Sequence, residues 1–566
     1  MSEMNMTGFD QAVPAAAEDL DPALAEFTPP KADNAQEPIG VILDIAGSSS
    51  LIALDLQRLQ ECCEDNDPSV ALAGQVGSQI KIRVGRGWLL ASVRTQRQDT
   101  KTPGGILANI DFLGEGEEER LTGKIHGFRR GVTRYPIPGA LVYPATSNDL
   151  RQIYASDGRS SVQIGTVFPT RDIRAGLYVD ALLGKHFALL GSTGTGKSTS
   201  AALILHKICE SAPQGHIVMI DPHGEYAAAF RHNGLIFDTS NLQLPYWLMN
   251  FEEHCEVLLT SQGEARQIDA DILAKCLLQA RMKNRLAEGM GKITVDSPIP
   301  YLLSDLSNIL QNEMGKLDKG TNSIPYMRIK TKLDELKSDP RYQFMFSGVL
   351  VGDTMAEFIS KIFRLPASGK PISIVDVSGV PSEVTSTVVA VLGRLIFDFA
   401  IWARDEETRP VLLVCEEAHR YVPNERNADG SSVGRILSRI AKEGRKYGVS
   451  LGLITQRPSD LAEGVLSQCG TIIAMRLNND RDQAFVKAAM PEGARGFLDS
   501  IPALRNRECI ISGEGVSVPI RVSFDTLDEI KRPASADPSI SDLWRQSGGE
   551  EEMVLRTVMR WRAQGR

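Results

Sequence analysis

Cysteine is scarce in this sequence and never occurs in Cys-x-x-Cys pairs. The eight cysteines are scattered from Cys62 to Cys509, and most of them lie in apolar runs. This pattern provides neither the paired ligands of a zinc site nor the framework of a disulfide-stabilised secreted domain. We therefore expect buried free thiols in a reducing cytoplasm.

Long apolar runs are also missing. The longest apolar segment, Val388 to Ala403, is interrupted by Arg394 and Asp398. It therefore predicts a buried helix rather than a membrane span. The first residues are polar and acidic, so we expect no signal peptide. These absences predict a cytoplasmic protein with no membrane partner.

The sequence has no excess of positive charge. It holds 62 Lys and Arg against 71 Asp and Glu, which gives a net charge of −9. The overall charge therefore gives no sign of nucleic-acid binding. A ring or cleft that binds nucleic acid needs only local positive charge, however. An apolar content of 42% and a charged content of 23% are ordinary for globular proteins, and 566 residues predict several domains.

The most informative stretch of the sequence is an apolar run (187–190), a glycine-rich loop (191–198) and a helical pattern (200–206) in direct succession. Glycines let the backbone turn its N–H groups inward, and the start of a helix adds its positive dipole end. Lys197 can reach the β- and γ-phosphates of a nucleotide, and the Ser198 hydroxyl can hold Mg²⁺. The alternative, a glycine-rich turn that binds nothing, is disfavoured by the flanking strand and helix patterns. The predicted ATP-binding loop consists of Gly191, Ser192, Thr193, Gly194, Thr195, Gly196, Lys197, Ser198 and Thr199.

Carboxylates follow two other apolar runs, and functional side chains collect at the carboxyl ends of strands in open α/β sheets. Asp221 ends the run 216–221 and is a candidate for orienting a water or a metal, with a turn or helix-cap role left equally open. Glu416 and Glu417 follow the run 411–415. In this Walker B pattern Glu416 occupies the position that holds Mg²⁺, and Glu417 that of the general base. The alternative is a strand that ends in two solvated acids.

Two further segments carry candidate residues. The helical pattern 433–446 has apolar residues on one face and a basic stripe of Arg435, Arg439, Lys442 and Lys446 on the other. The stripe fits either a phosphate-facing surface or a solvated face. Arg445, at the end of this helix, is a candidate arginine finger for the γ-phosphate of a neighbour. Gln456 follows the next strand and either senses the γ-phosphate or caps the strand.

The distribution of β-rich runs and helical patterns along the sequence predicts an α/β protein with several parts. Short β-rich runs with glycine turns suggest a small barrel or sandwich before the nucleotide-binding core. Helical periodicity between two core strands suggests an inserted helical subdomain. The predicted parts are an acidic disordered tail (1–37), the β module (38–170), the α/β core (171–250 and 346–532), the helical insertion (251–345) and a C-terminal tail with a terminal helix (533–566).

Taken together, these motifs resemble the HerA family of ring-forming DNA translocases, which is related to FtsK-type motors. The ordered set is specific, although the P-loop alone is generic. The resemblance covers nearly everything from Pro38 to about Val522. The matching pieces are Lys185-His186, the P-loop, Asp221-Pro222-His223-Gly224-Glu225-Tyr226, Glu417-Ala418-His419-Arg420-Tyr421, Glu443-Gly444-Arg445-Lys446-Tyr447-Gly448 and Thr455-Gln456-Arg457-Pro458.

The resemblance implies a homo-hexameric ring with a RecA-like core, an N-terminal HAS barrel and an inserted helical bundle. It implies ATP and Mg²⁺ between subunits, double-stranded DNA in the central channel, and a nuclease or other effector partner in DNA end processing or phage defence. It makes Arg445 an arginine finger acting in trans, Gln456 a γ-phosphate sensor and Lys185 a phosphate contact. The sequence departs from the family pattern at Glu416, where Asp is usual, and at Lys185, where Arg is frequent.

Two functions from different classes follow from these observations. The first is an ATP-driven DNA translocase or helicase. The second is an ATP-binding assembly platform that organises or gates a partner nuclease or NAD-consuming effector. A motor for protein or conjugative DNA secretion fits less well, because we expect no membrane anchor.

Overall fold

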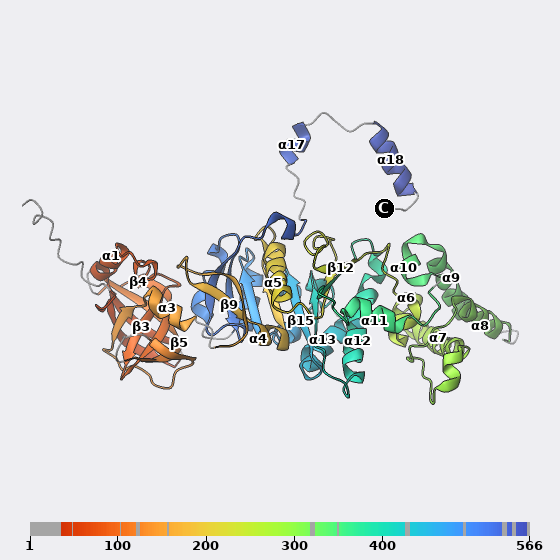
Figure 1. Cartoon of the computed structure of the whole chain (residues 1–566), viewed down its shortest axis with the longest axis horizontal. Coiled ribbons are helices and arrows are strands. Elements are labelled where there is room, and N and C mark those ends of the chain that lie inside the picture. The colour runs from red at the N-terminus through yellow and green to blue at the C-terminus, as the bar shows by residue number, and fades with distance from the viewer. Residues whose placement is uncertain are drawn as a thin grey trace, which may run out of the picture.

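The computed structural model describes residues 35–562 except 48, 102–103, 120–124, 155–157, 317–322, 348–349, 425–430, 491–493, 535–539 and 546–550. The expected acidic tail therefore lies almost entirely outside the described residues. In Figure 1 a β-barrel lies at one end, a large α/β sheet in the middle and a group of helices at the other end. The fold is α/β with an N-terminal barrel, as the sequence predicts.

The N-terminal module is a closed barrel of six strands. The strand order is β2-β1-β7-β3-β4-β5, and a further pairing of β2 with β5 closes the ring, while β6 pairs with β5 outside it. Alternating apolar residues such as Ile52, Ile80, Ile82 and Ile110 fill the interior and are fully buried. The strands are β1 (Gly40–Ala46), β2 (Ser49–Asp55), β3 (Gln79–Val84), β4 (Gly87–Gln98), β5 (Gly105–Glu118), β6 (Ile125–Arg130) and β7 (Leu141–Pro144), and the helices are α1 (Leu56–Cys63), α2 (Pro68–Ala71) and α3 (Ser147–Ile153).

The central sheet has eleven strands in the order β12-β13-β11-β14-β15-β10-β16-β17-β18-β8-β9. The strands from β12 to β16 in this order run parallel, and the others pair antiparallel. The strands are β8 (Ser161–Val167), β9 (Arg174–Tyr178), β10 (Phe187–Leu190), β11 (Ile217–Asp221), β12 (Gly234–Phe237), β13 (Ile372–Asp376), β14 (Val411–Cys415), β15 (Val449–Thr455), β16 (Thr471–Met475), β17 (Glu508–Gly513) and β18 (Ile520–Phe524). One expectation was wrong: the run 162–167, expected in the barrel module, pairs with β18 in this sheet.

Helices pack around the central sheet, and the longest of those described is α12. Residues such as Val388, Leu392 and Ile396 of α12 are fully buried, as predicted for this apolar segment. Among the described residues, α12 alone has the length and hydropathy to cross a membrane, and 61% of the apolar window is buried in the fold. The helices on this part are α4 (Val179–Gly184), α5 (Lys197–Ser211), α12 (Ser382–Trp402), α13 (Ser432–Glu443), α14 (Glu463–Leu466), α15 (Asp480–Ala489) and α16 (Arg495–Leu498), with 3₁₀ turns η5 (Ala418–Arg420), η6 (Gly444–Tyr447), η7 (Pro458–Asp460), η9 (Ile501–Ala503) and η10 (Glu529–Lys531).

The segment between β12 and β13 is helical, as its periodicity predicts. The helices α7, α8 and α9 contact one another pairwise and bury Leu277, Leu306 and Leu333 between them. Two apolar residues of this segment, Ile268 and Leu302, are exposed. The elements are η2 (Tyr246–Leu248), α6 (Phe251–Leu258), α7 (Glu264–Met282), η3 (Arg285–Gly289), α8 (Leu303–Gly315), α9 (Ile324–Ser338), η4 (Pro340–Tyr342), α10 (Gln343–Phe346) and α11 (Met355–Phe363). That this segment folds as a separate domain, and the domain limits in general, stay predictions.

The C-terminal region contains two exposed helices, α17 (Ile540–Arg545) and α18 (Glu551–Arg562). The second agrees with the predicted terminal helix. Its apolar side chains include Leu555 and Met559, which are 61% and 62% exposed. All eight cysteines of the chain are free thiols, and five of them are buried.

Candidate nucleotide-binding site

The glycine-rich loop joins β10 to α5 and has the backbone that its sequence predicts. Gly194 and Gly196 take φ values of +78° and +90°, which side chains with a Cβ rarely adopt. A Cβ on Gly191 would lie 2.9 Å from the Cβ of Met475, so the neighbouring strand also requires glycine here. The helix α5 begins at Lys197, and the first N–H groups of a helix have no partner within it. The loop and helix start therefore form a cradle for an anion.

Lys197 and Glu416 form a buried ion pair in this cradle. Lys197 Nζ donates to Glu416 Oε1 at 2.6 Å, and the two side chains are 9% and 5% exposed. The other carboxylate oxygen, Oε2, accepts a hydrogen bond of 2.8 Å from Tyr226 Oη. The strand register explains why Tyr226 and Glu416 lie close together. Ile220 of β11 pairs with Cys415 of β14, so the segments that follow these two strands leave the sheet at the same edge. Both oxygens of Glu416 are thus held by donors from distant parts of the sequence.

Glu417 lies next to this pair in an unusual backbone conformation. Its φ is +51°, and its side chain is 4% exposed. Within the described part of the chain its Oε2 has no hydrogen-bond partner, although His419 Nδ1 lies 3.2 Å away. Burial raises the pKa of the Glu417 carboxyl, and the Lys197 ammonium opposes this rise. A buried, incompletely paired carboxylate with a raised pKa is suited to accept a proton near neutral pH.

Gln456 reaches the phosphate loop directly. It follows β15, which lies beside β10, and Thr193 Oγ1 donates to Gln456 Oε1 at 2.5 Å. One residue earlier, Thr455 Oγ1 lies 2.9 Å from His419 Nδ1. The predicted sensor position is therefore linked to the loop by one hydrogen bond, and its strand is linked to the segment after Glu417 by another.

The geometry of Asp221 favours the turn role of the two that the sequence left open. Its Oδ1 accepts from the backbone N–H groups of His223 and Gly224, and its Oδ2 accepts from that of Tyr226 at 2.8 Å. The residue is fully buried, and burial raises its pKa to about 6. Both oxygens thus hold the loop that carries Tyr226, and the predicted contact to water or metal stays a prediction.

Lys185 and Arg445 lie at the opposite edge of the sheet from the loop. Lys185 precedes β10, whose four residues span ~13 Å before the loop begins. Its Nζ pairs with the Glu514 carboxylate. Within one chain Lys185 is thus separated from the loop by the length of β10, and its predicted phosphate contact stays a prediction. Arg445 lies in η6, just before β15, and its exposed side chain has no hydrogen bond or ion pair among the described residues.

The basic stripe is partly neutralised, because two of its four cations lie near carboxylates of the same chain. Arg435 pairs with Glu252, and Arg439 lies 3.6 Å from Glu443 and 4.8 Å from the ring centroid of Phe397. A cavity of about 470 Å³ opens beside these residues. The helical period correctly separated the faces of α13, but the acidic partner on α6 was not visible in the sequence. These contacts favour a solvated face over a phosphate-facing one.

Two residues of this site, Tyr226 and His419, belong to the matching motifs, but the sequence predicts no role for them. Their position five residues after Asp221 and two after Glu417 was the one available signal. Neither periodicity nor spacing indicates that the Tyr226 hydroxyl returns to Glu416, because that contact depends on the sheet register.

The residues present fit ATP with Mg²⁺. The cradle supplies backbone N–H groups and a lysine for phosphate oxygens, and Ser198 and Glu416 offer the hard oxygen ligands that Mg²⁺ prefers. Mg²⁺ usually needs only one or two protein ligands when phosphates supply others. This agrees with the finding that the described residues contain no cluster of three or more potential metal ligands.

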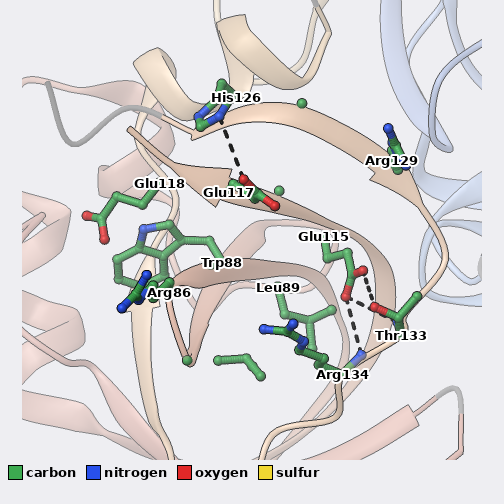
Figure 2. Close-up of a pocket in the computed structure, with 15 residues that line it drawn as sticks. Arg86, Trp88, Leu89, Glu115, Glu117, Glu118, His126, Arg129, Thr133 and Arg134 are labelled. Carbon is green, nitrogen blue, oxygen red and sulfur yellow. Dashed lines mark hydrogen bonds and ion pairs between the residues drawn. The ribbon is translucent and has the colours of Figure 1, made fainter. Parts of the chain in front are cut away.

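A hollow of about 880 Å³ lies on the barrel rather than at the loop. Figure 2 shows its mixed lining of arginines, glutamates and Trp88. Glu115 accepts from the hydroxyl and backbone N–H of Thr133, and these bonds lower its pKa. His126 Nε2 lies 4.0 Å from Glu117. Because its glutamates balance its arginines and no helix begins there, this hollow lacks the features of a nucleotide site.

Comparison with known proteins agrees with these observations. Residues 162–396 match the model of the helicase HerA central domain. The chain is 28% identical to the DNA double-strand break repair helicase HerA of Pyrococcus furiosus, covering 83% of this chain and 87% of that protein. It is 26% identical to the probable DNA double-strand break repair helicase HerA of Methanocaldococcus jannaschii, covering 75% and 88%.

A solved structure, VirB4 of Thermoanaerobacter pseudethanolicus, aligns over 67% of this chain and 100% of its own, with 16% identity and a TM-score of 0.48. That likeness is too low to bear on the fold or the function. The family match begins after the barrel, includes the phosphate loop and ends before Glu416. The chain is therefore similar to HerA helicases over most of its length, and it is a P-loop ATPase.

Proposed function

We propose that this protein is an ATP-driven DNA translocase or helicase that works as a ring on double-stranded DNA. One observation carries the proposal: the phosphate loop and Arg445 lie at opposite edges of the same sheet. A single chain cannot bring Arg445 to its own loop across the length of β15, so a second copy must supply it. Relatives named as DNA double-strand break repair helicases support DNA as the substrate.

The residues of the site divide the work of hydrolysis. When bound, ATP would supply the γ-phosphoryl group, and Mg²⁺ would neutralise charge on its oxygens. Lys197 would leave Glu416 to bind phosphate oxygens, while Ser198 and Glu416 would hold the metal. Glu417 would accept a proton from the attacking water, and Gln456 would exchange Thr193 for the γ-phosphate. Arg445 of the neighbouring copy would stabilise the charge that develops.

The finer parts of the proposal concern assembly and partners. A homo-hexamer would place one nucleotide between each pair of neighbours and DNA in the central channel. The exposed apolar side chains of α18 are consistent with contact to another copy. A nuclease or another effector would then couple DNA movement to DNA end processing or phage defence.

A second function is favoured by the carboxylate contacts of the two arginines on α13. Arg435 and Arg439 are engaged by carboxylates of the same chain, so they supply little free charge for DNA. In this alternative the protein is an ATP-binding platform, and nucleotide state organises or gates a partner nuclease or NAD-consuming effector.

The deciding experiment measures the ATPase rate with and without linear duplex DNA, for the wild type, Lys197→Ala and Arg445→Ala, together with the mass of each assembly. We expect stimulation by DNA, a mass corresponding to a ring and two inactive variants. Mixing the variants should restore part of the activity, because each supplies what the other lacks at a shared interface. A monomeric protein, or an ATPase indifferent to DNA, would overturn the translocase proposal and favour the platform.

A further inference from the structure

The phenol of Tyr226 is fully buried beside the phosphate loop, and its hydroxyl makes a hydrogen bond. Tyr226 Oη donates to Glu416 Oε2 at 2.8 Å, and the residue's own backbone N–H donates to Asp221 Oδ2 at 2.8 Å. The ring is therefore anchored at both ends. Its backbone is fixed by the turn after β11, and its hydroxyl by the carboxylate after β14.

A carboxylate can only accept hydrogen bonds, whereas a phenol hydroxyl can donate one. Tyr226 Oη is therefore the donor in this bond, and the acceptor, Glu416, is one of the two residues that would hold Mg²⁺.

The length of the Glu416 side chain explains why its hydrogen bond with Tyr226 matters. Glutamate has one more rotatable bond than the aspartate usual at this position, so its carboxylate needs more restraint to stay in one place. In this structure Lys197 holds one oxygen and Tyr226 the other. When Lys197 turns to a phosphate, the buried carboxylate loses one donor, and the phenol is the protein donor that stays.

We propose that Tyr226 is the positioning residue of Glu416, holding this longer carboxylate at the Mg²⁺ site when Lys197 has moved to the nucleotide. The inference rests on the proposed binding of ATP with Mg²⁺ at this loop. It assigns Tyr226 no direct contact with nucleotide or metal. Its effect is on how much Mg²⁺ strengthens nucleotide binding.

The test is Tyr226→Phe, which removes one oxygen and keeps the ring in its place. The measurement is equilibrium binding of a fluorescent, non-hydrolysable ATP analogue, first in EDTA and then at increasing Mg²⁺. We expect unchanged affinity in EDTA and an approximately tenfold smaller gain on adding Mg²⁺, typical of the loss of an outer-shell partner. Tyr421→Phe is the matched control, because Tyr421 is also buried but its hydroxyl has no partner among the described residues.

A double-mutant cycle separates positioning from a general packing role. Glu416→Asp withdraws the carboxylate by about 1.5 Å, one carbon–carbon bond, beyond the reach of the phenol. In that background Tyr226→Phe should have no further effect on the Mg²⁺ gain. Thermal unfolding of each variant in EDTA checks that the fold is retained.

The outcomes are distinct. The inference is overturned if Tyr226→Phe binds as the wild type does, if it loses affinity equally with and without Mg²⁺, or if its loss persists in the Glu416→Asp background. If the wild type itself gains nothing from Mg²⁺, the proposed nucleotide site fails, and the inference fails with it for that separate reason.

Discussion

The two edges of the parallel sheet differ in how complete they are. At the carboxyl edge, Lys197, Glu416 and Tyr226 are buried and joined by hydrogen bonds within one chain. At the amino edge, Arg445 is exposed and has no partner among the described residues. The carboxyl edge is thus a pre-organised binding site, and the amino edge presents the unpaired positive charge of Arg445. This difference is the basis of our proposal that the carboxyl edge of one copy meets the amino edge of another.

The largest expected effect tests the amino edge. Arg445→Ala should reduce ATP turnover by about 10³-fold, because an arginine finger stabilises charge only in the transition state. Nucleotide affinity should stay within about twofold of the wild type, since binding uses the other edge. Steady-state ATPase assays and equilibrium nucleotide binding provide the two readouts.

Lys446→Ala is the matched control for this prediction. Lys446 is an exposed cation on the same 3₁₀ turn η6. It should keep most of the wild-type rate. Equal losses in the two variants would mean that the turn contributes only general charge, and the distinction between the edges would then fail.

A smaller effect tests the base at the carboxyl edge. Glu417→Gln should lower turnover by about 10²-fold, within the usual range for loss of a general base. The amide has nearly the same size, so the αL backbone at this residue should be retained. Nucleotide binding, measured in the presence of Mg²⁺, should be kept. If Glu417→Gln turned over at the wild-type rate, another group would have to accept the proton.

The local parts of this site could be predicted from the sequence, and the long-range parts could not. The phosphate loop is a continuous motif with its strand and helix, and Gly194 and Gly196 take the backbone expected of them. The bond from Tyr226 to Glu416 joins residues 190 positions apart. It depends on β11 lying next to β14, which no local pattern encodes.

The same limit applies to the run 162–167 and to Lys185. The run 162–167 forms a strand, as expected of the β-rich part of the sequence, but the sheet that it joins is decided by its pairing with β18, more than 350 residues later. Lys185 precedes the phosphate loop in sequence, and the resemblance suggested a phosphate contact. An extended strand separates the two in space, because β10 carries the chain from one edge of the sheet to the other.

The pKa of Glu417 provides a further, more modest test. Burial raises this pKa above the ordinary glutamate value of 4.5. A base must be ionised to act, so the ATPase rate should fall on acidification through that raised pKa, at a higher pH than for an ordinary glutamate. A pH–rate profile at saturating nucleotide measures the acid limb. A rate independent of pH down to about 4.5 would contradict the burial argument.

The smallest expected effect concerns Lys185, at the amino edge. Lys185→Ala removes a partly exposed ion pair with Glu514, and such pairs contribute about 0–1 kcal/mol to the free energy of unfolding. Because Lys185 lies beyond the length of β10 from the loop, nucleotide affinity should stay within about twofold. Affinity is measured on dilute, unassembled protein, with Lys197→Ala as the control that loses binding. A clear loss of affinity in Lys185→Ala would mean that the amino edge reaches the nucleotide within one chain, and the second copy would no longer be required.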